Sequence, residues 1–508
     1  MTNLVELLKK LLRDVGLFVR YGSGLKLRRY QEAPARAIVN SVLHGKGLSF
    51  VVIFPRQSGK NELQAQIQVY LLTLFSGQRG QIVQISPTWK PQTENAMHRL
   101  EAVLSGNLVV GDRWAKHFGH IYQVGSARLV FLSGSPAANI VGATANVLLS
   151  IDEAQDIQID KYDKEIAPMA ASTNATRVFW GTAWTSNTLL AREEQAARAL
   201  QEEDGIQRVW RLTADDVAAE VPAYGQFVAD QVAKLGRNHP MVRTQYYSEE
   251  IDAEGGLFPH ERLMLIYGSH PPQIEPQAGS IYVMCLDIAG EDETGGDGSL
   301  LNETARDATA LTLAEVDLST LNDPGLRLPS YRIVARRLWV GVKHVALYGQ
   351  VLSLANTWNV RHLICDATGI GAGLTSFLSK SLGSRVIPFV FNSKTKSDLG
   401  WSFLSLIDSG RLKDYAPAEN MADRQTQLHT LFFEQLTATQ YEIVPGPEKK
   451  IKWAVPANSR NLATGERIHD DLVVSAAMLS LLDGLHWTVS TPAVMVKAID
   501  PLEEMKGF

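Results

Sequence analysis

The amino-acid sequence predicts an α/β protein whose 508 residues form more than one domain. A chain of this length exceeds the usual size of a single hydrophobic core. Short apolar runs rich in β-branched residues alternate with segments of helical spacing, which is the pattern of parallel sheets covered by helices. In the first half, two of these runs end in residues suited to phosphate chemistry. In the second half, aspartates follow the runs, so two α/β domains with different chemistry are expected.

The composition excludes several classes of protein. A hydrophobic content of 45% and a charged content of 20% are ordinary for a globular protein. The uncharged stretch 129–151 is broken by glycine, proline and asparagine, so it is not expected to span a membrane. No signal peptide is expected in the first 30 residues, where Lys and Arg interleave with Leu. Cys285 and Cys365 lie far apart in apolar runs, which favours a reducing, intracellular setting over disulfides or a zinc site.

The net charge of −5 gives no overall attraction to nucleic acid. Any DNA binding would therefore depend on local basic patches, of which residues 1–30 form one. A solvated amphipathic helix followed by a basic turn explains that segment equally well.

The first expected site is a loop between a strand and a helix. Residues 49–54 are an apolar run that Pro55 ends, and residues 62–75 place apolar side chains at helical spacing. Such a loop forms a cradle for phosphate, because free backbone N–H groups and the positive end of the helix dipole face the anion. Lys60 would reach the β- and γ-phosphates, and Gly59 would permit close backbone approach. The loop residues expected to contact a nucleotide are Gln57, Ser58, Gly59, Lys60 and Asn61.

This loop departs from the usual motif at two positions. Its first glycine is absent, and Asn61 replaces the Ser or Thr whose hydroxyl binds magnesium. Asn61 would therefore bind the ion through its amide oxygen or a water. An unremarkable strand-to-helix turn is the alternative explanation.

A second buried run, residues 146–151, ends on Asp152 and Glu153. Beside a phosphate loop, Asp152 can hold magnesium, and Glu153 can orient and deprotonate the attacking water. Two acids at a strand end also occur as a helix cap. Taken together, the loop and the acidic pair predict a motor that hydrolyses nucleotides.

Two further segments fit a motor. Gln31 follows two arginines and a tyrosine, and this element resembles the adenine-reading element of helicase-type motors. Residues 176–180 predict another strand, and Thr182 just beyond it can sense the γ-phosphate. Alternating strands and helices imply a parallel sheet with its sites at the carboxyl ends of the strands.

The second half begins after residues 271–279, whose prolines and glycine indicate an interdomain connection. Asp287 and Asp366 each follow an apolar run, and Asp470 and Asp471 open a helix. Carboxylates from separated elements can hold two divalent ions, which activate water and stabilise the leaving oxygen in phosphodiester cleavage. The expected strands cover residues 281–286, 307–313, 331–340 and 362–365.

This order of aspartates around a hairpin is that of an RNase H-like nuclease core. The expected catalytic metal ligands are Asp287, Asp366, Asp470 and Asp471, although Asp470 alone could be a helix cap. Basic residues expected at a DNA-facing rim beside them are Lys394, Lys396, Arg411 and Lys413.

Over nearly the whole chain, these motifs resemble the large terminase subunit of tailed bacteriophages. The residues that carry the resemblance are Arg56, Gly59, Lys60, Asp152–Ala154, Gly181–Ala183, Tyr246, Gly255–Phe258, Asp287, Asp307–Ala310, Asp366–Gly369 and His469–Asp471. The resemblance implies that Arg56 contacts phosphate. It also implies that Asp287, Asp366 and one of the paired aspartates bind the nuclease metals.

The implied architecture is an N-terminal P-loop ATPase of the ASCE type with a parallel central sheet, followed by an RNase H-like α/β nuclease domain. The expected divisions are an ATPase domain at 1–210, a lid or linker at 211–277, a nuclease domain at 278–490 and a tail at 491–508.

The implied function is a viral motor that hydrolyses ATP to move double-stranded DNA into the procapsid and cleaves concatemeric DNA. The implied cofactors are ATP and Mg²⁺, or Mn²⁺ at the nuclease site. The implied partners are double-stranded DNA, a portal protein, a small terminase subunit and further copies in a ring, with no membrane. The expected location is the host cytoplasm, with transient docking on the procapsid and absence from the mature virion.

One feature of the family is missing. Members often place an arginine shortly before the acidic motor strand as a finger into a neighbouring subunit, but residues 137–146 contain none. Arg113, Arg177 and Arg192 are weak replacements.

The sequence motifs are also compatible with two other functions. A helicase-type translocase with an appended nuclease, from a repair or restriction system, would share the motor motifs but carry a second motor domain. A non-catalytic DNA-binding packaging component would neither bind nor hydrolyse ATP.

Overall fold

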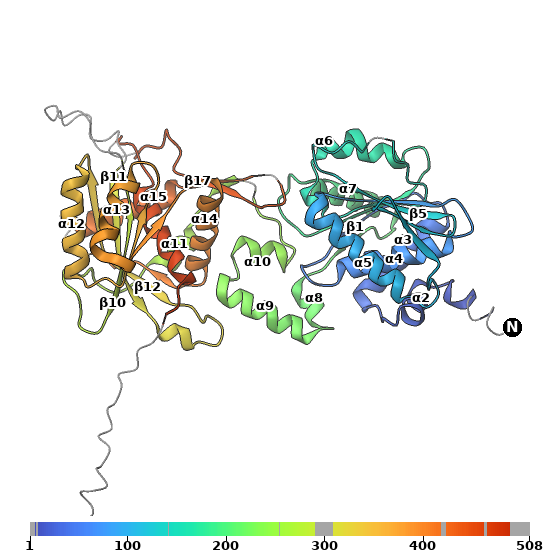
Figure 1. Ribbon diagram of the computed structural model, residues 1–508, viewed down its shortest axis with the longest axis horizontal. Coiled ribbons are helices and arrows are strands. Elements are labelled where there is room, and N and C mark those ends of the chain that lie inside the picture. Colours follow the sequence, from blue (N-terminus) through green and yellow to red (C-terminus); the bar gives the residue numbers. More distant parts are fainter. Residues whose placement is uncertain are drawn as a thin grey trace, which may run out of the picture.

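The computed structural model describes residues 6, 9–140, 142–252, 254–289, 308–417, 423–444, 446–461 and 465–487. These residues form two lobes, each built on its own sheet, with short helices between them (Figure 1). The expected α/β class is confirmed. The expected domain bounds stay a prediction, and the expected tail at 491–508 lies outside the described residues. In the described part of the chain, no helix has the length and apolar character needed to cross a membrane.

The strands of the first sheet are β1 (Ser49–Ile53), β2 (Gln81–Ser86), β3 (Trp114–His117), β4 (Ile121–Val124), β5 (Ala127–Ser133), β6 (Leu148–Ile151), β7 (Thr176–Gly181) and β8 (Val209–Arg211). Their order is β3-β4-β5-β2-β6-β7-β1-β8. The strands from β5 to β8 in this order are parallel, and β3 and β4 extend the sheet antiparallel at one edge. β7 separates β1 from β6, which is the strand insertion expected of the ASCE type.

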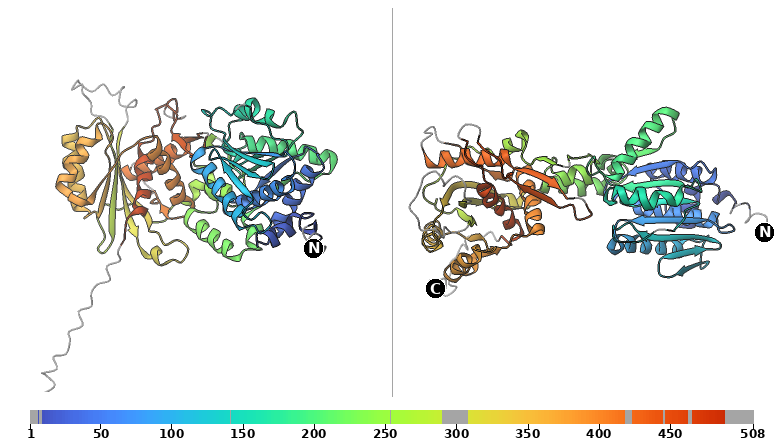
Figure 2. Two further views of the ribbon diagram at one scale, coloured as in Figure 1. Left: turned by 45° about the vertical axis from the view of Figure 1, so that its right-hand side comes forward. Right: turned by 90° about the horizontal axis from the view of Figure 1, so that it is seen from above.

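Helices cover both faces of this sheet (Figure 2). Alternate side chains of β1 enter different cores: Phe50 and Val52 join one cluster, and Val51 and Ile53 join the other. A strand covered on both faces has to be apolar at every position, which explains the continuous apolar run in the sequence. The helices of this lobe are α2 (Val15–Gly22), α3 (Arg29–Leu43), α4 (Lys60–Leu74), α5 (Glu94–Gly106), α6 (Ile159–Lys161) and α7 (Leu189–Asp204), with short turns η1 (Trp89–Thr93), η2 (Ala154–Asp156), η3 (Tyr162–Ile166) and η4 (Ala167–Ala170).

Three helices lie between the lobes: α8 (Ala214–Ala218), α9 (Pro222–Leu235) and α10 (Pro240–Gln245). Proline stands at the first position of α9 and α10. A backbone N–H at this position has no acceptor within the helix, so proline, which lacks the N–H, costs no hydrogen bond there. These helices have a small apolar core of their own around Tyr224 and Val242. They contact the second lobe through the Ser405 hydroxyl, which donates to the Lys234 carbonyl at 3.2 Å.

The strands of the second sheet are β10 (Ile281–Asp287), β11 (Ala308–Asp317), β12 (Ser330–Val340), β13 (His362–Asp366), β14 (Val386–Phe389) and β15 (Leu412–Lys413). Their order is β14-β13-β10-β11-β12-β15, in which β10, β11 and β12 are antiparallel and β13 is parallel to β10. The predicted hairpin and strand ends are therefore confirmed. Leu286 pairs with Cys365, so Asp287 and Asp366 leave the sheet at the same edge.

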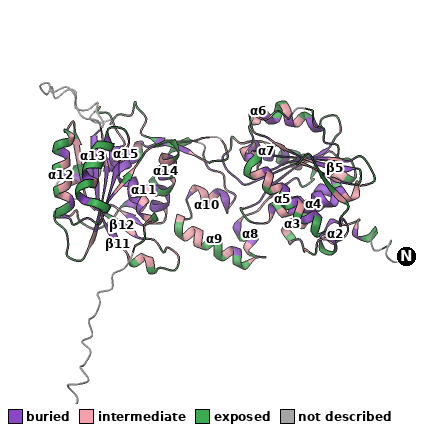
Figure 3. Ribbon diagram, in the orientation of Figure 1, coloured by how far each residue is buried: buried purple, intermediate pink, exposed green. Residues whose placement is uncertain are grey.

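Helices also cover both faces of the second sheet, and the buried residues gather on the strands and inner helix faces (Figure 3). They are α11 (His260–Ile266), α12 (His344–Thr357), α13 (Gly371–Leu382), α14 (Ser393–Asp408), α15 (Arg424–Ala438) and α16 (Asp471–Ala477), with η6 (Ser319–Asn322), η7 (Gly383–Arg385) and η8 (Met478–Gly484).

A third, small sheet was not predicted from the sequence. It consists of β9 (Glu254–Gly256), β16 (Gln440–Ile443) and β17 (Ile451–Ala454), in the order β17-β16-β9. β16 and β17 form an antiparallel hairpin that extends from the second lobe towards the first (Figure 1). The hairpin brings residues far along the chain to the loop that follows β1.

A buried ion pair ties α15 to the second sheet. Arg336 and Asp414 are both inaccessible to solvent and lie 2.8 Å apart, and the Nδ1 atom of His429 lies 2.9 Å from the same carboxylate. The Arg336 guanidinium also lies 3.9 Å from the centre of the Phe432 ring. Removing the charge of either Arg336 or Asp414 would leave the other as an unpaired charge in the core, which destabilises the fold.

We expect Asp414→Asn to lower the unfolding free energy of the second lobe by about 3 kcal/mol, because Arg336 would keep its charge in an apolar core. Calorimetry of the full chain, followed by urea titration, would measure the loss. The control is Asp160→Asn, which removes an exposed partner of Lys164 and should leave stability unchanged. Equal effects of the two substitutions would contradict the prediction.

Candidate functional sites

The loop after β1 has a tightly fixed backbone. Gly59 adopts φ 92°, a left-handed conformation that favours glycine, immediately before α4 begins at Lys60. The Ser58 carbonyl accepts a hydrogen bond from the Tyr30 hydroxyl at 2.8 Å. The Ser58 hydroxyl donates to the Pro55 carbonyl at 2.7 Å and is turned away from solvent. The positive end of α4 therefore opens onto the space above the loop.

The helices between the lobes support the same loop. The Arg56 backbone N–H donates to the Gln245 carbonyl at 2.8 Å, and the Tyr224 hydroxyl donates to the Arg56 carbonyl at 2.8 Å. Backbone groups of Arg56 are thus occupied on both sides, while its side chain is exposed and lines the pocket. A loop held in this way keeps its shape before any ligand arrives.

Lys60 and Glu153 meet across this loop. The Nζ atom of Lys60 lies 2.6 Å from Oε1 of Glu153. Burial opposes the charge of Lys60, but attraction to Glu153 and Asp152 outweighs it and raises the lysine pKa. Burial likewise opposes the charge of Glu153, but Lys60 and a hydrogen bond from Gln155 lower its pKa. The two groups therefore remain a charged pair.

Glu153 stands at the N-cap position of η2, but its side chain does not cap the helix. It precedes η2 but makes no capping hydrogen bond with its side chain, and its backbone adopts φ 45°. A left-handed non-glycine residue is strained, and such strain concentrates at functional sites. The Glu153 carboxylate pairs with Lys60 instead of bonding to the helix N-terminus.

Asp152 lies deeper than expected. It is 3% exposed and accepts a hydrogen bond from Nε2 of Gln64 at 2.9 Å, and it does not line the pocket. Burial raises the pKa of Asp152 in spite of the opposing effect of Lys60. Burial makes the charged form of Asp152 unfavourable, and a cation bound next to it would stabilise that form.

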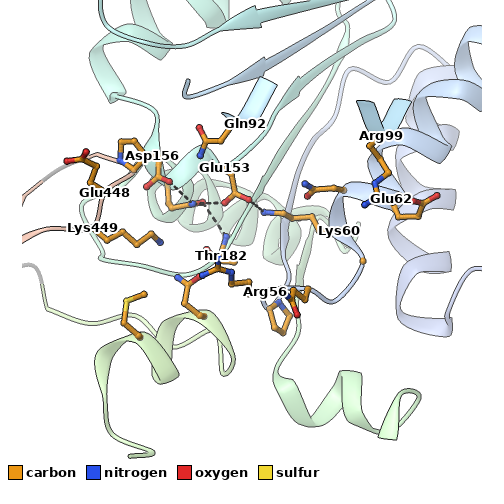
Figure 4. A pocket seen from close by; sticks show the side chains of 18 residues that line it. Arg56, Lys60, Glu62, Gln92, Arg99, Glu153, Asp156, Thr182, Glu448 and Lys449 are labelled. Atoms are coloured by element: carbon orange, nitrogen blue, oxygen red, sulfur yellow. Dashed lines mark hydrogen bonds and ion pairs between the residues drawn. The ribbon is translucent and has the colours of Figure 1, made fainter. Parts of the chain in front are cut away.

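A pocket of about 770 Å³ lies above the loop (Figure 4). It brings together most of the predicted nucleotide contacts: Arg56, Gln57, Gly59, Lys60, Asn61, Glu153 and Thr182. Ser58 and Gln31 are excluded from its lining, since the Ser58 hydroxyl bonds to the backbone and the Gln31 amide donates to the Gly59 carbonyl at 3.1 Å. Gln31 therefore supports the loop in this state.

Three parts of this pocket were not predicted from the sequence. Gln155 links its two sides, because Nε2 donates to Glu153 at 2.7 Å and Oε1 accepts from the Thr182 N–H at 3.2 Å. Arg99 lines the rim and pairs with Glu62 at 3.1 Å. The hairpin between β16 and β17 contributes Pro447, Glu448 and Lys449. Of these three parts, only Gln155 could have been noticed in the sequence, because it lies two positions after Glu153.

None of the three candidate finger arginines lines this pocket. Arg113 donates to the Val110 carbonyl at 3.1 Å, and Arg192 pairs with Asp163 at 2.8 Å. Arg177 lies near the beginning of β7, at the opposite end of the strand from Thr182. None of these three arginines therefore contributes to the nucleotide pocket of its own chain.

The predicted acidic residues of the second lobe gather at one edge of its sheet. Asp287, Asp470 and Asp471 line a pocket of about 240 Å³ together with Lys396. Burial, and repulsion from Asp471, Asp366 and Asp470, raise the pKa of Asp287 well above its ordinary value. The positive charge of Lys396 opposes this shift only in part. A buried carboxyl group with a strongly raised pKa beside further carboxylates marks a candidate functional site.

The carboxylates of the second lobe make separate hydrogen bonds. Among the described residues, no group of three His, Cys, Asp or Glu side chains is placed to hold a metal as it stands. Asp366 accepts from the Thr368 N–H at 2.7 Å and Asp471 from the Ala308 N–H at 3.1 Å. Asp470 lies at the N-cap of α16 but makes no capping hydrogen bond with its side chain. Asp307 lies outside the described residues.

The expected basic rim is only partly correct. Lys396 lies 3.8 Å from Asp470, and Lys394 is exposed. Arg411 is 2% exposed and pairs with Asp483 at 2.7 Å, so its place at a DNA-facing rim was wrong. The β15 strand that follows it packs into the core and carries Arg411 inward. Lys413 donates to the Leu265 carbonyl at 2.8 Å.

Comparisons with known proteins agree with the motifs. No family model matches the chain. The probable terminase ATPase subunit of Haemophilus phage HP1 is 24% identical over 90 residues, which are 18% of this chain and 15% of that relative's length. The predicted resemblance to phage terminases is thereby confirmed.

Two solved structures are also similar. The large terminase of thermophilic bacteriophage D6E has a TM-score of 0.47 and 11% identity, covering 90% of this chain and 98% of that one. The large terminase nuclease of thermophilic phage G20c has a TM-score of 0.30 and 16% identity, covering 44% of this chain and 96% of that one.

We expect a pH-dependent effect from Asp156, which lines the first pocket. Burial raises the pKa of Asp156 from 3.8 to about 6. Repulsion from Glu153 also raises this pKa, whereas attraction to Lys449 and Lys60 lowers it. The folded state therefore binds this proton more tightly than the unfolded chain does. The contribution of the protonated Asp156 to the unfolding free energy is complete below pH 3.8 and is lost as the pH rises through about 6. Asp156→Asn should remove that loss, which is at most about 3 kcal/mol.

Thermal unfolding at a series of pH values tests this expectation. The variant should match the wild type near pH 4 and unfold at a higher temperature above about pH 6.5. Asp112→Asn, at an exposed position, should change neither value. A stabilising effect of Asp156→Asn that is independent of pH would refute the electrostatic explanation.

Proposed function

We propose that this chain is the large subunit of a phage DNA-packaging machine, in which the first lobe hydrolyses ATP and the second cleaves DNA. The observation that carries the proposal is the pair of Lys60 and Glu153, held 2.6 Å apart over a phosphate-binding loop. The carboxylate cluster in the second lobe of the same chain distinguishes a packaging nuclease from a general motor.

The first site suits γ-phosphate hydrolysis. Without nucleotide, Lys60 and Glu153 neutralise each other; phosphates at the loop would compete for Lys60 and leave Glu153 free to orient and deprotonate the attacking water. Thr182, whose backbone N–H is joined to Glu153 through Gln155, would sense the change. Asp152 and Asn61 would hold Mg²⁺, which supplies charge neutralisation on the phosphates.

The second site suits phosphodiester cleavage. Asp287, Asp366, Asp470 and Asp471 offer the oxygen ligands that Mg²⁺ and Mn²⁺ prefer, and their mutual repulsion would be relieved by cations. Bound divalent ions would supply water activation and stabilisation of the leaving oxygen. Lys396 beside the cluster is suited to contact a DNA phosphate.

The proposed partners follow from the same family. They are double-stranded DNA, a portal protein, a small terminase subunit and further copies of this chain in a ring on the procapsid. The proposed site of action is the host cytoplasm, with transient docking and no place in the mature virion.

The topology of the second sheet disfavours a helicase-type translocase. A second motor domain would be built on a parallel sheet, whereas β10, β11 and β12 are antiparallel. A non-catalytic packaging component would lack ATP binding altogether, so the ATPase measurements below also test it.

We expect Lys60→Ala and Glu153→Gln to lower ATP turnover at least about 100-fold, because the first removes a phosphate contact and the second the general base. DNA cleavage with Mg²⁺ or Mn²⁺ should survive in part. Steady-state phosphate release by purified full-length protein measures the effect. Lys46→Ala and Glu203→Gln, both at exposed positions, are the matched controls.

We expect the reverse result from Asp366→Ala. Plasmid cleavage should fall at least about 100-fold, since a metal ligand is lost, while ATP turnover is kept. Asp398→Ala, at an exposed position on α14, should affect neither activity. Intact cleavage by the Asp366 variant would rule out the proposed nuclease site.

A further inference from the structure

The second lobe contributes a cation to the pocket of the first. Lys449 lies in the turn between β16 and β17, and its side chain points from the hairpin into the pocket (Figure 4). It is separated from Lys60 by most of the chain and belongs to none of the motifs found in the sequence. Its position depends entirely on how the hairpin meets the first lobe.

The hairpin is anchored where the lobes meet. Nε1 of Trp401, on α14, donates to the Lys449 carbonyl at 3.0 Å. The Trp184 ring, which follows β7 in the first lobe, lies 6.3 Å from the Trp401 ring and 4.4 Å from Nζ of Lys449. Lys449 itself adopts φ 50°. Contacts from both lobes therefore hold its backbone and side chain in this unusual conformation.

The Lys449 ammonium group is buried and unsatisfied. Among the described residues, its Nζ atom has no hydrogen-bond partner. Burial lowers the pKa of Lys449, which Asp156 and Glu153 oppose at longer range. This ammonium group lies over the Trp184 ring, and its three N–H donors have no acceptor among the described residues, which costs free energy.

The surrounding charges indicate the missing acceptor. Lys60 and Arg56 also influence Lys449, and both repel it. Acidic side chains also line the pocket, and Lys60 is paired with Glu153. A bound polyanion would supply the acceptors that Nζ of Lys449 lacks and would be attracted by Arg56, Lys60 and Lys449 together. Lys60 and Glu153 mark the part of the pocket where the terminal phosphate and attacking water would lie. Lys449 acts on both residues from the opposite side.

We infer that Lys449 donates hydrogen bonds to the terminal phosphate of a nucleoside triphosphate bound at the loop after β1. This inference rests on the proposed ATP binding by the first lobe. The second lobe would thus provide, within the same chain, a cation at the position where charge develops during hydrolysis. Because the contact requires the hairpin, triphosphate binding would stabilise this arrangement of the two lobes, and a diphosphate would not.

The test compares a non-hydrolysable ATP analogue, AMP-PNP, with ADP by titration calorimetry on the full-length protein. Lys449→Met removes the charge but keeps an unbranched side chain over Trp184. We expect it to weaken AMP-PNP binding about tenfold or more and to change ADP binding less than about threefold. Lys449→Arg should restore most of the preference for the triphosphate.

Lys452→Met is the matched control, since this lysine lies on the same hairpin with its side chain 70% exposed. It should bind both nucleotides as the wild type does. Unchanged AMP-PNP binding by Lys449→Met, or an equal loss of both nucleotides, would overturn the inference and leave Lys449 as a structural contact. A wild-type protein that binds neither nucleotide would instead refute the proposed ATPase function itself.

Discussion

The buried pair of Lys60 and Glu153 depends on the order of the strands. β7 lies between β1 and β6, so the loop after β1 and the acids after β6 face each other across one strand. That separation leaves space for phosphates, yet it allows a lysine side chain to reach the carboxylate at 2.6 Å. Parallel strands bring their carboxyl ends to one edge of the sheet, and every other group in the pocket is placed relative to this pair.

Contacts between the lobes extend the same site. Helices α9 and α10 hold the backbone of Arg56, while the hairpin of the second lobe closes another side of the pocket. Trp184 and Trp401 meet at this junction. Side chains of both lobes therefore line one pocket, and aromatic rings of both lobes pack together beside it.

The acidic cluster of the second lobe illustrates the opposite electrostatic situation. In the first pocket, cations and anions are both present, and Lys60 compensates Glu153. Around Asp287, the neighbours are mainly further carboxylates, so burial and repulsion act in the same direction on its pKa. The first site is balanced before ligands bind, whereas the second has an excess of negative charge that divalent cations would balance.

Local patterns in the amino-acid sequence predicted many of the strands and helices and the residues at their ends. Apolar runs and the residues that follow them were sufficient to place Lys60, Glu153, Asp287 and Asp366 at strand ends, because burial on both faces and helix N-termini leave signals within a few residues. The same patterns predicted the parallel sheet and the hairpin at β11 and β12. They could not show that Asp152 turns towards Gln64 or that Arg411 points into the core.

The distant segments that complete the sites could be identified only from the folded chain. Gln155 acquires its role by bonding to both Glu153 and Thr182, and Lys449 reaches the pocket on a hairpin whose sequence carries no nucleotide-binding pattern. Such roles arise from packing between segments far apart in the chain, where burial and unpaired charge depend on the partner. A strand end can be recognised from its own residues, but the function of a surface hairpin depends on the surface that it contacts.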